Sequence, residues 1–249
     1  MWIRDRSETL RVKTEQQLTP HWSDQIEVVS DPPLKWKDDA RDQWLVTRLV
    51  EVLSGTRKKA LLISPYFVPG EDGSRALVGM VSNHQAYVGV ITNSLAANDV
   101  PAVHAGYSKY RKPLLVGSVH LYEVRANQSA EANGSNSLFG SSGASLHTKA
   151  FVVDGARGFV GSFNFDPRSA QLNTEMGVVF DHPALAAEVK RLFDAGTRPE
   201  SAWRVTLDEG GALRWHGEGG QTRAREPEAS AGLRALVWLL SWLPIESQL

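Results

Sequence analysis

The chain has 249 residues, enough for one large domain or two small ones, and no cysteine, which excludes disulfide bonds and thiolate metal sites. Its 27 basic and 28 acidic residues argue against a protein-wide attraction for nucleic acid, although a local basic patch stays compatible with this balance. The charged amino terminus lacks the apolar run of a signal peptide, and no stretch reaches the roughly 18 apolar residues of a membrane span. The sequence therefore predicts a protein that is soluble or peripheral to a membrane.

The first elements of the chain are a lead-in, a strand and a helix. Residues 1–24 are polar with isolated apolar positions, and we interpret them as a lead-in or edge segment. A short strand is expected over 25–30, and Asp31-Pro32-Pro33 ends it. An amphipathic helix is predicted from Asp39 to about Gly55, with these apolar residues on one side: Leu45, Leu49, Val52 and Leu53.

A strand-helix-strand unit follows. Residues 60–64 form a continuous apolar run that is typical of a strand buried on both faces. A helix over about 74–82 and a second strand over 87–92 complete the unit, whose crossover makes the two strands parallel. Asn93-Ser94 then opens a loop at the carboxyl end of the second strand, where ligands gather in open α/β sheets.

The middle of the chain is predicted to contain a helix, a third strand and a long loop. The helix lies within 99–115, where Val103, Tyr107, Tyr110 and Leu114 form a packing stripe. His104 follows a loop at the ligand-binding end of the sheet, which makes it a second-tier site candidate. The third strand is expected over 119–124. Residues 127–145 are rich in Ser, Gly and Asn, and we interpret them as a surface insertion in preference to a lid.

Residues 145–177 carry the chemically informative residues. A buried strand is predicted over 146–153, so that His147 and Lys149 project from one face and Leu146, Thr148 and Ala150 from the other. A turn at Asp154-Gly155 leads to a second short strand over 159–163, which returns small and polar groups towards the first.

The residue types of this stretch suit phosphoryl transfer. Lys149 offers a point charge for a phosphate oxygen, and Ser162 and Asn164 offer neutral hydrogen bonds. His147 can serve as nucleophile or general acid near neutral pH. A zinc site needs three or four ligands, whereas only His147 and Glu175 could serve here, so no metal or other cofactor is expected.

The carboxyl-terminal part is predicted to hold further strands and helices. A strand over 177–180 is followed by a helix that Asp181 caps and Gly196 ends. Residues 203–207 and 212–216 are typical of a β-hairpin, and the charged, Gly-rich run 217–230 indicates a flexible linker. The final segment, 232–249, is apolar and contains Trp238 and Trp242. We expect it to dock on the core in preference to lying at a membrane surface.

The spacing H-x-K-x4-D-x6-G-S-x-N resembles the HKD signature of the phospholipase D superfamily at every specified position, namely His147, Lys149, Asp154, Gly161, Ser162 and Asn164. Further strings are similar to the second half of bacterial cardiolipin synthases, at 64–70, 92–99, 104–107, 121–123 and 243–246. The resemblance implies an α/β fold of the α/β/α sandwich type. It also implies that Lys149, Ser162 and Asn164 hold phosphate, that Glu175 orients a histidine and that Asp154 supports the strand turn.

Together with the patterns along the chain, the resemblance indicates three domains or segments: the lead-in 1–24, a phospholipase D-like domain over 25–200, and a hairpin, linker and apolar helix over 201–249. Enzymes of this superfamily build one active site from two HKD motifs, and this chain has one. The other histidines, none followed two residues later by lysine, are His21, His84, His104, His120, His182 and His216. The missing half is expected to be an N-terminal half of the same protein, in preference to a second copy or a separate chain.

The resemblance thus implies a phosphatidyltransferase that moves a phosphatidyl group through a phosphohistidine to a second phospholipid. We expect its substrate to be a phospholipid and its location to be peripheral, on the cytoplasmic face of the bacterial inner membrane. Two rivals remain: a dimeric phosphodiesterase acting on nucleic acid, which the balanced charge disfavours, and a non-catalytic membrane-binding half.

Overall fold

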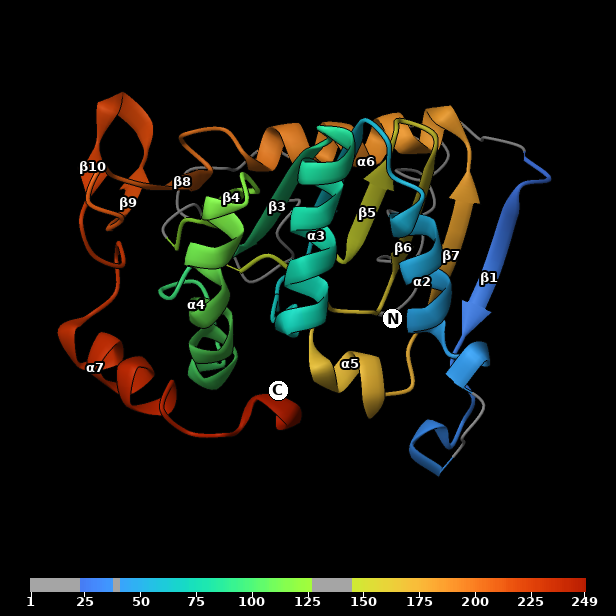
Figure 1. Cartoon of the computed structure of the whole chain (residues 1–249), viewed down its shortest axis with the longest axis horizontal. Helices are drawn as coiled ribbons and strands as arrows, with labels where there is room; N and C mark the ends of the chain where they lie inside the picture. Colours follow the sequence, from blue (N-terminus) through green and yellow to red (C-terminus); the bar gives the residue numbers. More distant parts are fainter. Residues whose placement is uncertain (1–22, 38–40, 127–144) are drawn as a thin grey trace, which may run out of the picture.

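The computed structural model describes residues 23–37, 41–126 and 145–249. In this part of the chain, ten strands form one mixed sheet in the order β1-β7-β6-β5-β2-β3-β4-β8-β9-β10 (Figure 1). The strands are β1 (Ile26–Ser30), β2 (Lys59–Ile63), β3 (Tyr87–Asn93), β4 (His120–Val124), β5 (Ala150–Val153), β6 (Arg157–Gly161), β7 (Met176–Asp181), β8 (Ala202–Leu207), β9 (Leu213–His216) and β10 (Thr222–Arg223).

Helices cover both faces of the sheet, which confirms the α/β class. They are α2 (Leu45–Ser54), α3 (Gly70–His84), α4 (Pro101–Val116), α5 (Pro167–Gln171), α6 (Pro183–Gly196) and α7 (Ala231–Leu240), with short 3-10 turns η1 (Lys35–Lys37), η2 (Arg41–Gln43), η3 (Glu218–Gly220) and η4 (Glu246–Gln248). Figure 1 shows α2, α3 and α4 in front of the sheet and α6 behind it.

Alternation of side chains along the central strands builds the two layers of core. Phe151 and Val153 of β5 join the cluster beneath α2, α3 and α4, whereas Ala150 and Val152 join the cluster beneath α6. The same alternation divides Leu62 from Leu61 on β2. A strand buried on both faces needs apolar residues at consecutive positions, which is why these segments lack a polar face.

The strand directions define one edge of the sheet that matters below. β2, β3 and β4 are parallel, as the crossover predicted, and β5 runs antiparallel to β2. The carboxyl ends of β2, β3 and β4 therefore lie at the same edge as the start of β5, with Ile63 paired to Ala150. We call this edge the carboxyl edge. It lies at the bottom of Figure 1.

Three local predictions were wrong. The strand expected over 146–153 begins only at Ala150, so His147 and Lys149 precede it, outside any strand or helix. The cap of α6 is His182, whose Nδ1 accepts from the Leu185 amide at 3.4 Å, because Asp181 still belongs to β7. The run 217–230 is no free linker, because β10 pairs with β9 and Glu226 pairs with the buried Arg111.

The remaining strands and helices agree with the predictions apart from their boundaries. The hairpin is present as β8 and β9, and both strands extend the same sheet through β4. Two predicted segments, the lead-in as far as residue 22 and the loop over 127–144, lie outside the described residues.

Candidate active site

His147 and Lys149 lie at the carboxyl edge, in the segment that leads into β5. Leu146 and Ala150 are buried beneath α6, so the chain is anchored while the His147 side chain is exposed and Lys149 is half-buried. Asn93, at the end of β3, holds this segment from the neighbouring strand. Its Oδ1 accepts from the Leu146 amide at 2.9 Å, and its Nδ2 donates to Ser145 Oγ at 3.1 Å. The position of His147 thus depends on a buried amide of β3.

Lys149 lies among carboxylates from separate elements. Its Nζ donates to the carbonyl oxygen of His147 at 2.9 Å, which leaves two of its three N–H groups for other acceptors. Burial lowers the pKa of Lys149, and the negative charges of Glu175, Asp166 and Asp99 act in the opposite direction. The ammonium group is therefore a partly desolvated cation, and a phosphate binding there would meet a stronger field than at an exposed lysine.

Glu175 is the centre of a hydrogen-bond network below the site. Its side chain is buried, and its carboxylate accepts from Ser162 Oγ, from Ser169 Oγ at 3.0 Å and from Asn173 Nδ2 at 3.3 Å. Among the described residues, no hydrogen bond joins Glu175 to His147. The Ser162 proton points to Glu175, so a bound phosphate would have to compete with this carboxylate for it.

A buried ion pair supports Glu175 from beneath. Lys35 Nζ donates to Asp31 Oδ2 at 2.8 Å and to the Ser169 carbonyl oxygen at 2.9 Å. The same Asp31 oxygen accepts from the Glu175 amide at 3.0 Å. Asp31 and Lys35 are 4% and 0% exposed, which requires them to remain paired. In the sequence, Asp31 is recognisable only as the start of an Asp-Pro-Pro run that ends a strand. No local sequence pattern indicates that Asp31 pairs with Lys35 and supports Glu175.

Asn164 presents an uncommitted side-chain amide. Its backbone amide donates to Ser169 Oγ at 3.3 Å, but its side-chain Oδ1 is buried without a partner. Within the described part of the chain, the side chain makes no hydrogen bond at all. Buried amide groups normally have partners, so this exception is a place where a ligand can complete the hydrogen bonding. The unpartnered Oδ1 is an acceptor and does not suit a phosphate oxygen, so the predicted phosphate contact would use the Nδ2 group of Asn164.

Asp154 lies at the opposite end of β5 from His147. Its carboxylate accepts from the amides of Arg57, Lys58 and Lys59 at 2.8–2.9 Å, and its own backbone adopts a φ of 52°. Burial would raise the pKa of Asp154, but these amide hydrogen bonds outweigh it and hold the pKa below its ordinary value. The carboxylate joins the start of β2 to the turn after β5, and this arrangement is consistent with the supporting role that the motif implies.

His104 lies in a buried ionic cluster at the start of α4. Its Nε2 is 2.8 Å from the Arg111 guanidinium and 3.2 Å from Glu226 Oε1, while its Nδ1 has no partner. Burial opposes the charge of Glu226, but Arg111 and His104 outweigh it and hold the pKa of Glu226 to about 2. Arg111 also pairs with Glu123 at 3.5 Å. The contacts of His104 thus tie the segment before α7 to α4.

Asp99 and Tyr66 are site neighbours that the sequence did not single out. Tyr66 follows β2, Asp99 follows β3, and the Tyr66 hydroxyl donates to Asp99 Oδ1 at 2.7 Å. Burial and this hydrogen bond raise the pKa of Tyr66. The sequence could have indicated these two residues by their position alone, because the loops that carry them follow the carboxyl ends of the parallel strands β2 and β3.

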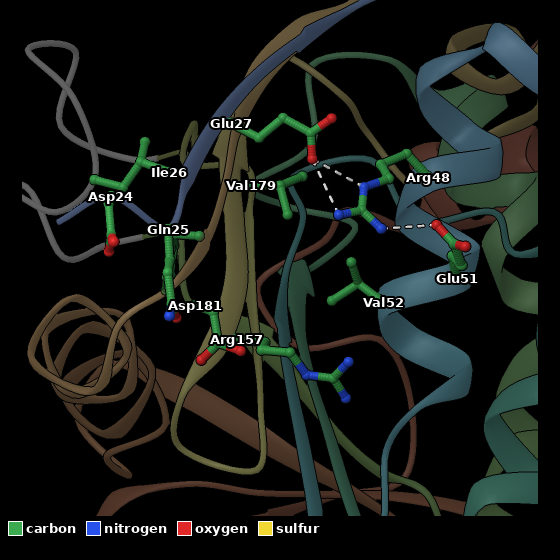
Figure 2. A pocket seen from close by; sticks show the side chains of 11 residues that line it. Asp24, Gln25, Ile26, Glu27, Arg48, Glu51, Val52, Arg157, Val179 and Asp181 are labelled. Carbon is green, nitrogen blue, oxygen red and sulfur yellow. Dashed lines mark hydrogen bonds and ion pairs between the residues drawn. The ribbon is translucent and has the colours of Figure 1, made fainter.

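A surface hollow of about 630 Å³ lies away from these residues (Figure 2). It is lined by β1, α2 and the far ends of β6 and β7, and it includes Arg48, Arg157 and Asp181. Arg48 is already paired with Glu27 at 3.0 Å and with Glu51 at 2.7 Å. None of the predicted site residues lines this hollow. Across the described residues, no group of three or more His, Cys, Asp or Glu is placed to hold a metal ion.

Two solved structures are similar to this chain. The first is the phospholipase D family member Nuc from Salmonella typhimurium, with 15% identity and a TM-score of 0.49 over 68% of this chain and 91% of that one. The second is a phosphatidylserine synthase from Haemophilus influenzae, with 17% identity and a TM-score of 0.48 over 77% and 44%. These scores are too low to support an assignment by themselves.

Sequence comparison is more informative. Cardiolipin synthase C of Escherichia coli K12 is 40% identical over 224 residues, which cover 88% of this chain and 47% of that protein. The chain thus spans about half the length of this curated relative. A family model described as "Cardiolipin synthase, PLD-like domain" matches residues 49–196, which include His147, Lys149 and Glu175. Because this match covers more than half of the chain, the chain belongs to the phospholipase D-like domain family of the cardiolipin synthases.

Proposed function

We propose that this chain is one catalytic half of a phospholipase D-type phosphatidyltransferase that forms cardiolipin from two phospholipids. One observation carries the proposal: at the carboxyl edge, the half-buried ammonium group of Lys149 donates to the backbone carbonyl oxygen of His147, whose side chain is exposed. The Nδ2 group of Asn164 would add a hydrogen-bond donor for a phosphate oxygen. The similarity to cardiolipin synthase C supports the choice of a phospholipid substrate.

The proposed reaction has two displacements at phosphorus. In the first, one histidine attacks the phosphodiester, the bond from phosphorus to the leaving oxygen breaks, and a second histidine gives that oxygen a proton. In the second, the hydroxyl group of the acceptor lipid loses its proton to this second histidine and attacks the phosphohistidine, which releases the first. Lys149 and Asn164 would hold the phosphate oxygens through both steps, where charge develops. His147 is one of the two histidines, as nucleophile or as general acid.

The second histidine must come from another HKD half. An exposed apolar surface beside Ser162 supports such a partner: it contains Val28, Val160 and Met176, which are 70%, 45% and 57% exposed. Val28 and Val160 both pair with Val178, and the Met176 amide donates to Ser162 Oγ at 3.0 Å, so this surface adjoins the site. Since the chain spans 47% of cardiolipin synthase C, we propose an N-terminal half of the same protein as the preferred partner.

We further propose that the enzyme acts as a peripheral protein on the cytoplasmic face of the inner membrane. Within 23–37, 41–126 and 145–249, no helix is long and apolar enough to cross a bilayer. The reaction itself brings the protein to lipid, because both proposed substrates reside in the membrane.

The test is a His147→Ala substitution in a complete assembly that contains both HKD halves. Incubation with phosphatidylglycerol vesicles should yield cardiolipin with the unsubstituted chain and none with the variant. His84→Ala is a suitable control, because His84 ends α3 at the opposite edge, beside Arg57 at 2.6 Å. Cardiolipin formation by the His147→Ala assembly would refute the assignment. Cleavage of plasmid DNA without lipid turnover would instead support the dimeric phosphodiesterase.

A further inference from the structure

Helix α7 has apolar side chains on both of its faces. Val237 is buried, and together with Leu233 and Leu240 it packs against Leu95 and Ala105. The outward side of the helix and of the turn that follows it is also apolar. We call this surface the outer face of α7; it consists of Leu236, Trp238, Leu239, Trp242 and Leu243, which are 44%, 60%, 59%, 74% and 47% exposed. A helix with large apolar residues on two opposite faces is normally covered on both of them. The outer face of α7 therefore lacks a cover.

The two tryptophans give the outer face a particular chemistry. Trp238 and Trp242 pack edge to face, with ring centroids 5.8 Å apart and an interplanar angle of 72°. Both rings remain more than half exposed. Tryptophan combines a large apolar surface with one N–H donor, and it is favoured where hydrocarbon meets the polar headgroups of a bilayer. A large exposed patch of this kind indicates an interaction site.

The charges around α7 favour an anionic surface. The carboxylates of segment 221–249 are paired with basic groups: Glu226 with Arg111, Glu228 with Arg125 and Glu246 with Lys109. Arg223 and Arg225, which precede α7, are exposed and form no ion pair with any described residue. The segment that leads into α7 therefore carries exposed cationic charge. An anionic phospholipid surface is complementary to both features.

The outer face also lies at the edge of the molecule that carries the proposed chemistry. Leu95, beneath α7, follows Asn93, which holds the segment before His147. Beyond α7, the chain returns to α5, where the Arg168 amide donates to the Leu249 carbonyl oxygen at 2.6 Å. Figure 1 shows α7 and the carboxyl terminus along the same lower edge of the sheet. A bilayer in contact with α7 would therefore lie beside the carboxyl edge.

We propose that the outer face of α7 docks this chain on the surface of an anionic phospholipid bilayer, with Trp238 and Trp242 in the headgroup region and Arg223 and Arg225 against the lipid phosphates. The inference rests on the proposed function only in choosing a lipid surface over a protein partner. The apolar surface of Val28, Val160 and Met176 differs from the outer face of α7, because it is formed by strands and contains no tryptophan.

The test measures binding of the full 249-residue chain to sucrose-loaded vesicles by co-sedimentation. Vesicles of phosphatidylglycerol and phosphatidylethanolamine are compared with vesicles of phosphatidylcholine. The double variant Trp238→Ser, Trp242→Ser should lower the partition coefficient more than about tenfold, given roughly 25 cal/mol per Å² of apolar area. Arg223→Gln and Arg225→Gln should each lower it about fivefold on the anionic vesicles only.

Val116→Ser is the matched control. Val116 is 75% exposed, but it ends α4 at the opposite edge, so its substitution should leave the partition coefficient unchanged. Wild-type partitioning by the tryptophan double variant would overturn the proposal. So would a loss of affinity for the other HKD half without any loss of vesicle binding, since that result identifies a protein interface. Tryptophan-dependent vesicle binding without cardiolipin formation in the paired assembly would refute the proposed function and leave the docking surface intact.

Discussion

Replacing Lys35 with methionine tests whether the buried ion pair beneath Glu175 organises this part of the fold. Lys35 is fully buried, and its ammonium group binds Asp31 at 2.8 Å and the Ser169 carbonyl oxygen at 2.9 Å. Asp31 in turn accepts from the amides of Leu45 at 2.8 Å and Glu175 at 3.0 Å. Lys35→Met removes the cation and leaves the Asp31 carboxylate buried without its counter-charge.

The expected cost follows from the geometry. Two unit charges 2.8 Å apart attract each other by about 6 kcal/mol at an effective dielectric constant of about 20. Part of this attraction only offsets the loss of hydration of both groups. Removing one partner of a buried pair costs about 3–5 kcal/mol, because the remaining charge stays desolvated. We therefore expect Lys35→Met to lower the free energy of unfolding by about 3–5 kcal/mol.

Urea unfolding followed by circular dichroism measures this change, and Lys190→Met is the matched control. Lys190 also pairs with an aspartate four residues away, Asp194, but these side chains are 47% and 54% exposed. Exposed pairs contribute about 0–1 kcal/mol, so the control should change little. The reasoning is refuted if the two variants lose the same free energy within about 0.5 kcal/mol.

A double variant separates charge from hydrogen bonding at the same site. Lys35→Met combined with Asp31→Leu removes both charges, but it leaves the amides of Leu45 and Glu175 without an acceptor. Each buried donor without a partner costs about 1–3 kcal/mol. The double variant should therefore remain less stable than the unsubstituted chain. A double variant with the same free energy of unfolding as the unsubstituted chain would show that Asp31 serves only to neutralise Lys35.

Two further predictions concern the HKD motif. Burial lowers the pKa of Lys149, so its charge is disfavoured in the folded state. Lys149→Met should therefore raise the free energy of unfolding at pH 7 in urea titrations, and this gain should shrink as the pH rises through the lowered pKa towards the ordinary value of 10.5. The same variant should abolish cardiolipin formation in the paired assembly. Amide hydrogen bonds outweigh burial and lower the pKa of Asp154, so its contribution is present above the ordinary value of 3.8 and is lost as pH falls through the lowered pKa. Asp154→Asn should cost about 1 kcal/mol at neutral pH, after allowance for solvent screening, and progressively less as the pH falls through the lowered pKa.

Opposite outcomes would change these assignments. A Lys149→Met chain that is less stable at pH 7 would show that the neighbouring carboxylates outweigh desolvation. An Asp154→Asn chain with unchanged stability but no turnover in the paired assembly would show that Asp154 takes part in the reaction.

Local patterns predicted the central elements because their causes are local. Consecutive apolar residues predicted β2, and the crossover length predicted its parallel pairing with β3, as the structure confirms. The same reasoning placed the start of β5 too early. Whether the residues around His147 form a strand depends on their backbone pairing with β2. That pairing begins only at Ala150, which is opposite Ile63. Pairing partners far apart in the chain decide such boundaries.

The linker prediction for 217–230 was wrong for a related reason. Charged and glycine-rich sequence usually remains solvated, but here Arg111, buried on α4, draws Glu226 into the protein at 2.6 Å. The attraction comes from a residue more than 100 positions earlier in the chain, so composition alone cannot reveal it.

The sequence by itself identified the family of this protein, because the spacing of His147, Lys149 and Asn164 matches the HKD motif wherever the strands begin. The same sequence showed that the chain contains one such motif. Only the tertiary structure decided what supports that motif. Asp31 and Lys35 lie under Glu175, and Asn93 holds the backbone before His147, through contacts between residues distant in the chain. It also decided that α7 buries one apolar face and exposes the other, because a helix with apolar residues on two faces does not itself indicate which face the protein will cover.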